Sequence, residues 1–101
     1  MSEINSKIKS KEMDLFFEAI LKLENLEECY NLFEDVATIN EVKSLAQRMH
    51  VAKLLNEKKT YTEIVEITGA STATISRVNR CLNYGSDGYS LLLERIRKDE
   101  E

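Results

Sequence analysis

The sequence predicts an all-α protein, and two observations support this fold class. The chain has 101 residues with no proline and only three glycines, so few positions interrupt a helix. Apolar residues recur at three- and four-residue steps along most of the chain, which is the period of an amphipathic helix. We expect six helices forming a single domain over residues 11–98, preceded by a flexible arm at residues 1–10 and followed by an acidic tail at residues 99–101.

The first two helices are predicted by apolar spacing and by a capping pattern. One starts at about Lys11, and its apolar face consists of Met13, Phe16, Phe17, Ile20 and Leu23. The next begins after Asn25, whose side chain can cap the free backbone amides while Glu28 reaches back, as in a capping box. This second helix is expected to bury Cys29, Leu32, Phe33 and Val36.

A longer third helix is predicted after Thr38, which has the spacing of a capping box with Glu41. Its expected apolar stripe consists of Val42, Leu45, Ala46, Met49, Ala52 and Leu55. The other face carries Lys43, Gln47, Arg48, His50 and Lys53. Residues 56–59 contain no apolar side chain and therefore predict a surface loop.

Two short helices and a final one complete the chain. Thr60 and Glu63 form another capping box, and the helix behind them carries Ile64, Val65 and Ile67. Gly69 can adopt the positive φ that a tight turn requires. The next helix runs from Thr72 to Leu82 with Ile75, Val78 and Leu82 inward, and after a loop at residues 83–88 the last one runs from about Tyr89 to Lys98.

The charge is unevenly distributed along the chain. The net charge of −4 argues against nucleic-acid binding when it is taken as a whole. Residues 1–42, however, carry four basic and ten acidic residues, whereas residues 43–80 carry seven basic and three acidic ones. The middle of the chain is therefore basic enough to contact a polyanion.

The basic part contains the pattern of a helix-turn-helix at about residues 61–82, two short helices joined by a turn with glycine at its centre. Small and hydroxylated residues begin the second helix, arginines follow, and no Asp or Glu occurs between Thr68 and Ser86. Such side chains suit base edges and phosphates in a major groove. The candidate DNA-binding residues are Thr62, Ser71, Thr72, Ala73, Ser76, Arg77 and Arg80, with possible phosphate contacts from Arg48, His50, Lys58 and Lys59.

Other function classes find little support in the sequence. One histidine and two cysteines, Cys29 and Cys81, do not have the spacing of a metal site, so we expect no metal, no cofactor and buried reduced thiols. No nucleophile–base pair or phosphate-binding loop predicts an enzyme. No apolar run approaches the ~20 residues of a membrane span, and we expect a cytoplasmic protein without a membrane partner.

The stretch from Thr60 to Leu82, with Gly-Ala-Ser-Thr-Ala-Thr-Ile-Ser-Arg at its centre, resembles the Trp repressor family and most closely its YerC/YecD-type branch. The preceding Leu45-Ala-Gln-Arg48 and Leu54-Leu55 belong to the same resemblance, which covers roughly residues 11–98. It implies a six-helix, intertwined homodimer whose helix-turn-helix units bind a palindromic operator on double-stranded DNA.

The resemblance also implies a possible effector pocket formed by Arg48, Thr74, Arg77, Val78 and Cys81. In the Trp repressor, a glycine underlies the indole of the corepressor, and here Val78 replaces it with a branched side chain. Cys81 likewise replaces the serine that bonds the ligand's ammonium group. The spacing from Arg48 to Leu54 is one residue shorter than in the family pattern. We therefore expect no tryptophan binding, and the sequence identifies no other effector.

Three function classes remain open at this point, of which an enzyme has the least support. The first is a sequence-specific DNA-binding transcriptional regulator, expected to be a repressor. The second is a protein-interaction module that uses the helix-turn-helix to dock on the transcription machinery. Salt dependence distinguishes the first two, because phosphate contacts weaken steeply as the salt concentration rises.

Overall fold

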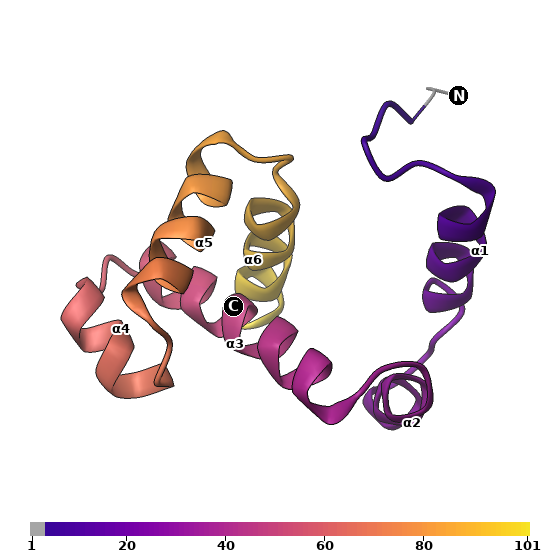
Figure 1. Ribbon diagram of the computed structural model, residues 1–101, viewed down its shortest axis with the longest axis horizontal. Coiled ribbons are helices and arrows are strands. Elements are labelled where there is room, and N and C mark those ends of the chain that lie inside the picture. Colours follow the sequence, from indigo (N-terminus) through magenta and orange to yellow (C-terminus); the bar gives the residue numbers. More distant parts are fainter. Residues whose placement is uncertain (1–3) are drawn as a thin grey trace. The chain divides into compact units, whose positions relative to one another are not determined.

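The protein is described from a computed structural model, which covers residues 4–101. This part of the chain contains six helices and no strand, which confirms the all-α prediction (Figure 1). The helices divide between two compact units, Met1–Thr38 and Ile39–Glu101. The first contains α1 (Lys11–Ile20) and α2 (Leu26–Val36), and the second contains α3 (Ile39–Asn56), α4 (Tyr61–Thr68), α5 (Thr72–Tyr84) and α6 (Gly88–Asp99).

Helix boundaries lie close to the predicted ones, except that α1 ends at Ile20, before Leu23 of the predicted apolar face. The boundaries of α5 and α6 differ as well. The former continues to Tyr84 instead of ending at Leu82, and the latter begins at Gly88 and ends at Asp99. Residues 1–3 of the predicted arm lie outside the described residues, and residues 4–10 contain no helix. The assignment of residues 11–98 to a single domain stays a prediction.

Both helices of the first unit have side-chain N-caps, of which Asn25 was predicted and Ser10 was not. Ser10 Oγ accepts a hydrogen bond from the Met13 N–H at the start of α1. At α2, Asn25 Oδ1 accepts from the Glu28 N–H at 2.9 Å, while the Glu28 carboxylate accepts from the Glu24 N–H at 2.9 Å. In a standard capping box this carboxylate would accept from the N–H of the N-cap residue, Asn25, whereas here it accepts from the N–H of the residue before it.

The apolar side chains of the first unit make few contacts within it. The Phe16 and Phe33 rings meet edge to face with centroids 6.4 Å apart, joining α1 to α2. No residue of either helix is buried, and Leu26 and Val36 are 74% and 53% exposed. The predicted burial of Val36 is therefore wrong within one chain, because no described side chain of the unit covers that end of α2.

The hydrophobic core of the second unit surrounds the C-terminal half of α3. In Figure 1, α4, α5 and α6 all lie around this half of the helix. The buried side chains are Val51, Ala52, Leu54, Ile64, Ala70, Ile75, Val78 and Leu93. Gln47 adds a polar tie, since its Nε2 donates to the Thr68 carbonyl oxygen at 3.2 Å and thereby joins α3 to the end of α4.

This packing corrects the predicted stripe of α3. Val51 and Leu54 were placed off the stripe but are fully or almost fully buried, whereas Leu45 is 54% exposed. A single stripe describes a helix that packs on one side only. The end of α3 contacts three helices and therefore buries a wider arc, while no described residue buries its beginning.

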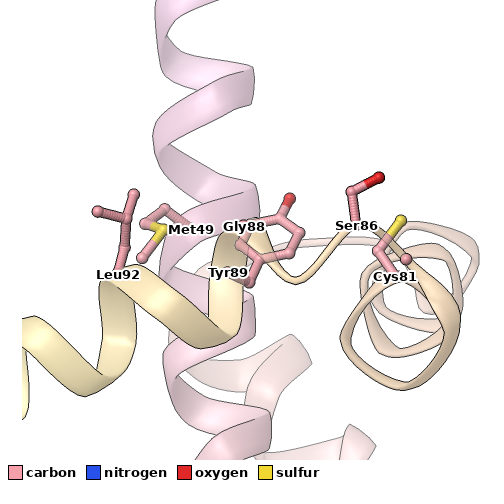
Figure 2. A pocket seen from close by; sticks show the side chains of 7 residues that line it. Met49, Cys81, Ser86, Gly88, Tyr89 and Leu92 are labelled. Carbon is pink, nitrogen blue, oxygen red and sulfur yellow. The ribbon is translucent and has the colours of Figure 1, made fainter. Parts of the chain in front are cut away.

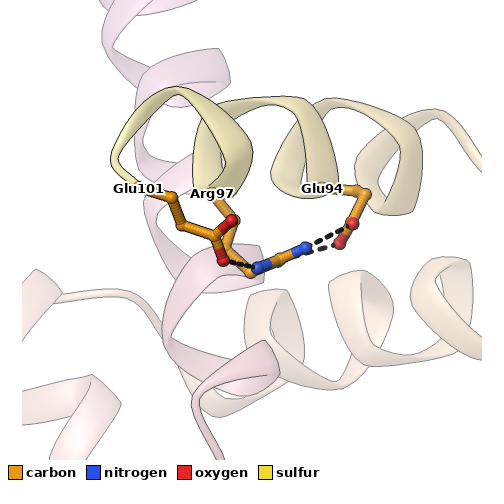
Figure 3. Close-up of polar contacts among 3 residues, drawn as sticks. All are labelled: Glu94, Arg97 and Glu101. Atoms are coloured by element: carbon orange, nitrogen blue, oxygen red, sulfur yellow. Dashed lines mark hydrogen bonds and ion pairs between the residues drawn. The ribbon is translucent and has the colours of Figure 1, made fainter.

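Helix α6 carries a surface ion-pair cluster near the end of the described chain. The Arg97 guanidinium donates two hydrogen bonds to Glu94, at 3.1 and 2.6 Å, and a further one to Glu101 (Figure 3). The hydrogen bond from Arg97 lowers the pKa of the Glu94 carboxyl below its usual value. This arginine is thus neutralised by neighbours on its own helix.

Candidate nucleic-acid interface

The turn between α4 and α5 is fixed by local hydrogen bonds. Gly69 ends α4 with φ +73°, in the left-handed region that glycine adopts at little cost, and its N–H donates to the Val65 carbonyl oxygen at 2.8 Å. Thr68 Oγ1 donates to the Ile64 carbonyl oxygen at 2.7 Å and accepts from the Ala70 N–H at 3.1 Å. The two helices therefore meet through a short and rigid connection.

The start of α4 is held by the predicted capping box. Thr60 Oγ1 accepts from the Glu63 N–H at 3.2 Å, and the Glu63 carboxylate accepts from the Thr60 N–H at 3.1 Å. These bonds to Thr60 lower the pKa of Glu63. The carboxylate also adds negative charge at the start of α4, where the helix dipole favours it.

Helix α5 separates its core residues from its exposed ones. Ile75 and Val78 are buried at 0% and 2% exposure and hold the helix against the core. Thr72, Ala73, Ser76, Arg77 and Arg80 are all exposed, as is Thr62 on α4. The structure therefore leaves the predicted DNA-binding side chains accessible on one unit and anchors their helix through different residues.

Ser71 has a structural role in addition to its predicted one. It is the N-cap of α5, and its Oγ accepts from the Thr74 N–H at 3.1 Å. The same hydroxyl donates to Thr74 Oγ1 at 3.1 Å. Its donor is thus used inside the helix, and the first turn of α5 presents the Thr72 hydroxyl and the methyl groups of Thr72 and Ala73 outward.

The arginines of α5 lie in an environment without competing carboxylates. Within residues 4–101, neither Arg77 nor Arg80 forms an ion pair, in contrast to Arg97 on α6. The sequence from residue 69 to residue 85 also contains no Asp or Glu. Both guanidinium groups keep their donors for an external anion, and a bidentate bond to a phosphate or to guanine suits their geometry.

The predicted phosphate contacts lie on α3 and on the loop that follows it. Arg48 is half-buried and His50 is exposed, both on α3. Lys58 and Lys59 are exposed in the loop before α4, where Lys58 has φ +66° and the Lys59 N–H donates to the Leu54 carbonyl oxygen at 3.1 Å. The loop backbone is thereby fixed, while both lysine side chains remain accessible.

The residues of the predicted effector pocket differ in their surroundings. Val78 is 2% exposed and belongs to the core of the second unit. Thr74 is half-buried, and Arg77 is exposed. The prediction that both thiols are buried is wrong, since Cys29 is half-buried and Cys81 is exposed, although both are free.

Cys81 is exposed because it borders an open hollow rather than the core. The hollow has a volume of about 460 Å³, and its wall is mostly apolar. Met49 lines it from α3, Tyr89 and Leu92 line it from α6, and the chain at residues 85–88 forms its remaining side (Figure 2). Of the five predicted pocket residues, only Cys81 contributes to it.

Two features of this unit were missed from the sequence. Gln47 was assigned to a polar face, but its bond to Thr68 positions the helix-turn-helix on α3. Tyr84 was placed in a loop, but it is the last residue of α5 and is 87% exposed. The spacing of Tyr84 from Ala73 and Arg80, eleven and four residues, is the signal that indicates a shared helical face.

The part of the chain that the structure describes lacks two other kinds of site. No group of three or more His, Cys, Asp or Glu side chains in residues 4–101 could hold a metal ion. No helix in the same range has the length and apolar character that crossing a membrane requires.

The profile of the family described as Trp repressor protein matches residues 11–97, which includes all of α1 to α5 and most of α6. The chain belongs to the Trp repressor family. This membership confirms the resemblance predicted from the helix-turn-helix sequence. Members of the Trp repressor family are helix-turn-helix DNA-binding regulators rather than enzymes.

One protein sequence and two solved structures are similar over nearly the whole chain. The uncharacterized protein YerC of Bacillus subtilis (strain 168) is 56% identical over 94 residues, which cover 93% of this chain and 90% of YerC. A TrpR-like protein from Eubacterium eligens superposes with a TM-score of 0.87 at 59% identity, covering 91% of this chain and 95% of that one. A structure assigned to the Trp repressors from Staphylococcus aureus also gives 0.87, at 49% identity and with 90% and 91% coverage.

Proposed function

We propose that the protein is a sequence-specific transcriptional regulator that binds a palindromic operator as a homodimer through α4 and α5, and that it acts as a repressor without tryptophan. The single observation that carries this proposal is the exposed face of α5. Ser76, Arg77 and Arg80 lie on this face. Helix α5 contains no carboxylate, and neither arginine forms an ion pair within residues 4–101. Such a face combines hydrogen-bond donors with the positive charge that DNA phosphates attract.

The exposed apolar surface of the first unit supports a homodimer. Leu15, Leu21 and Leu26 are 68%, 81% and 74% exposed, and no residue of α1 or α2 is buried. Several large apolar side chains exposed on one unit indicate an interaction surface, and a second copy of the chain supplies the same surface. Sedimentation at micromolar concentration is expected to give a dimer, and a monomer would contradict the proposal.

The core position of Val78 supports independence from tryptophan. Its side chain packs with the residues that anchor α5, so the helix is held in place without a ligand. Titration calorimetry with L-tryptophan is expected to show no binding heat. A saturable heat at millimolar tryptophan or below would mean that the valine moves aside and that this part of the proposal is wrong.

Selection of bound sequences from random double-stranded DNA tests the central proposal. Two similar half-sites in opposite orientation are expected, with centres about one helical turn, ~34 Å, apart or a multiple of this distance. Fluorescence anisotropy with the selected operator then gives the affinity as a function of salt. The logarithm of the association constant is expected to fall linearly with the logarithm of the salt concentration, by about 0.9 for each phosphate contact.

Arginine variants show whether α5 is responsible for the binding. Arg77→Ala and Arg80→Ala are expected to weaken binding, with a smaller salt slope wherever the lost contact is to a phosphate. Arg97→Ala is the matched control. Because Arg97 forms ion pairs with Glu94 and Glu101, its replacement should leave the affinity unchanged. If the wild-type protein shows no saturable DNA binding at low salt, the interaction-module interpretation replaces this proposal.

A further inference from the structure

Tyr84 is exposed to a degree that its position in the core-forming unit does not explain. Its exposed fraction is 87%, higher than that of any other aromatic side chain in residues 4–101, of which Tyr30 at 64% comes next. It forms no ring contact in this part of the chain. This side chain is therefore available to a binding partner.

The helical spacing places Tyr84 on the proposed DNA-binding face. Ala73, Arg77, Arg80 and Tyr84 follow one another at steps of four, three and four residues, so they share one face of α5. This face lies opposite Ile75 and Val78, the buried residues of the helix. Tyr84 thus continues the line of exposed side chains that begins at the N-terminal turn.

The length of α5 indicates which part of DNA Tyr84 would meet. A rise of 1.5 Å per residue puts Tyr84 about 16 Å further along the axis than Ala73. In helix-turn-helix proteins the N-terminal residues of the recognition helix contact the bases, and the major groove is about 12 Å wide. With Ala73 at the bases and α5 running across the groove, this distance exceeds the groove width and would bring Tyr84 to the phosphates at its edge.

The chain around Tyr84 leaves the phenol accessible. Helix α5 ends directly after it, because Gly85 is the C-cap and its N–H donates to the Cys81 carbonyl oxygen at 2.9 Å. A Cβ at Gly85 would collide with that same oxygen, so glycine is required where the backbone departs. The next residue, Ser86, is small, and the nearest carboxylate in the sequence after the turn is Asp87.

We propose that the Tyr84 hydroxyl donates a hydrogen bond to a backbone phosphate at the edge of the major groove. This inference rests on the proposed function and adds a neutral positioning contact to the arginines of α5. Tyrosine donates to phosphate oxygens in protein–DNA complexes. Because the phenol carries no charge, its contact contributes to affinity without releasing a counterion.

Tyr84→Phe tests the contact by removing only the hydroxyl group. With the selected operator, its dissociation constant is expected to rise about fivefold or more, in line with the loss of a hydrogen bond to a charged acceptor. The salt slope should stay that of the wild type, whereas a phosphate-binding arginine variant lowers it. Tyr89→Phe is the matched control, since it removes the same group from a tyrosine on α6, outside the proposed DNA-binding residues, and should leave the affinity unchanged.

A neutral methylphosphonate, substituted one at a time along the operator backbone, locates the contacted phosphate. At one position in each half-site, the methylphosphonate is expected to lower the affinity of the wild-type protein and to leave the affinity of Tyr84→Phe unchanged. Equal affinity of wild type and Tyr84→Phe would overturn the inference while the proposed function stands. A changed sedimentation coefficient of Tyr84→Phe would overturn it as well, because the side chain would then serve an interface between protein chains.

Discussion

Replacing Val78 with alanine measures how much this side chain contributes, by filling the core beneath α5, to the free energy of unfolding. Val78 is 2% exposed and packs in the cluster formed by α3, α4, α5 and α6. The substitution removes two methyl groups, worth about 0.8 kcal/mol each in lost transfer free energy. The remaining cavity adds to this cost, and the better helix propensity of alanine subtracts about half a kcal/mol. We expect the free energy of unfolding to fall by about 2 kcal/mol.

Urea denaturation followed by circular dichroism measures this change. Wild type and variant are compared at the same protomer concentration, because the midpoint of a dimeric protein depends on concentration. Ser76→Ala is the matched control on the exposed face of α5 and should change the stability by no more than about 0.5 kcal/mol. If Val78→Ala behaved like this control, Val78 would not fill the core, and the physical reason given against tryptophan binding would be lost.

Two further predictions concern the ends of α4. Because hydrogen bonds from Thr60 lower the pKa of Glu63, its charged form stabilises the folded protein above its usual pKa of 4.5, and this contribution is lost as the pH falls through the lowered value. The stability difference between wild type and Glu63→Gln should therefore be largest near pH 7 and shrink below about pH 4.5, and a pH-independent difference in urea midpoints would contradict the capping geometry. Gly69→Ala should cost about 1–2 kcal/mol, since its φ is +73° although an added Cβ meets no atom within 4 Å. Gly88→Ala, equally unobstructed but without a positive φ, should be neutral or stabilising by up to about 1 kcal/mol, and equal urea midpoints for the two variants would show that backbone strain is not the cause.

The helix ends could be predicted because the groups that form them are neighbours in the sequence. Asn25, Thr60 and Gly69 each act on backbone atoms within four residues, and the structure confirms all three as caps. The resemblance to the Trp repressor family also rests on residues that are neighbours in the sequence, around the turn at Gly69. Local chemistry of this kind is visible in a sequence without any knowledge of which helices meet.

The buried side of each helix was harder to predict, because it depends on packing between distant segments. Val51 and Leu54 are buried since three helices surround the end of α3, and no periodicity within α3 shows this. Cys81 looked like a core residue from its type, but the chain after α5 leaves it beside an open hollow. The exposed positions of the candidate DNA-binding residues were predictable as a pattern, whereas the Gln47 bond that ties α4 to α3 joins residues 21 apart.

The separation of anchoring and exposed positions on α5 also bears on how this family diverges. Ile75 and Val78 hold the helix in the core, while Thr72, Ala73 and Ser76 are exposed. Under the proposed function, changes at these three positions alter the preferred operator at little cost in folding free energy. A regulator built in this way can acquire new target genes through a few substitutions while its scaffold stays the same.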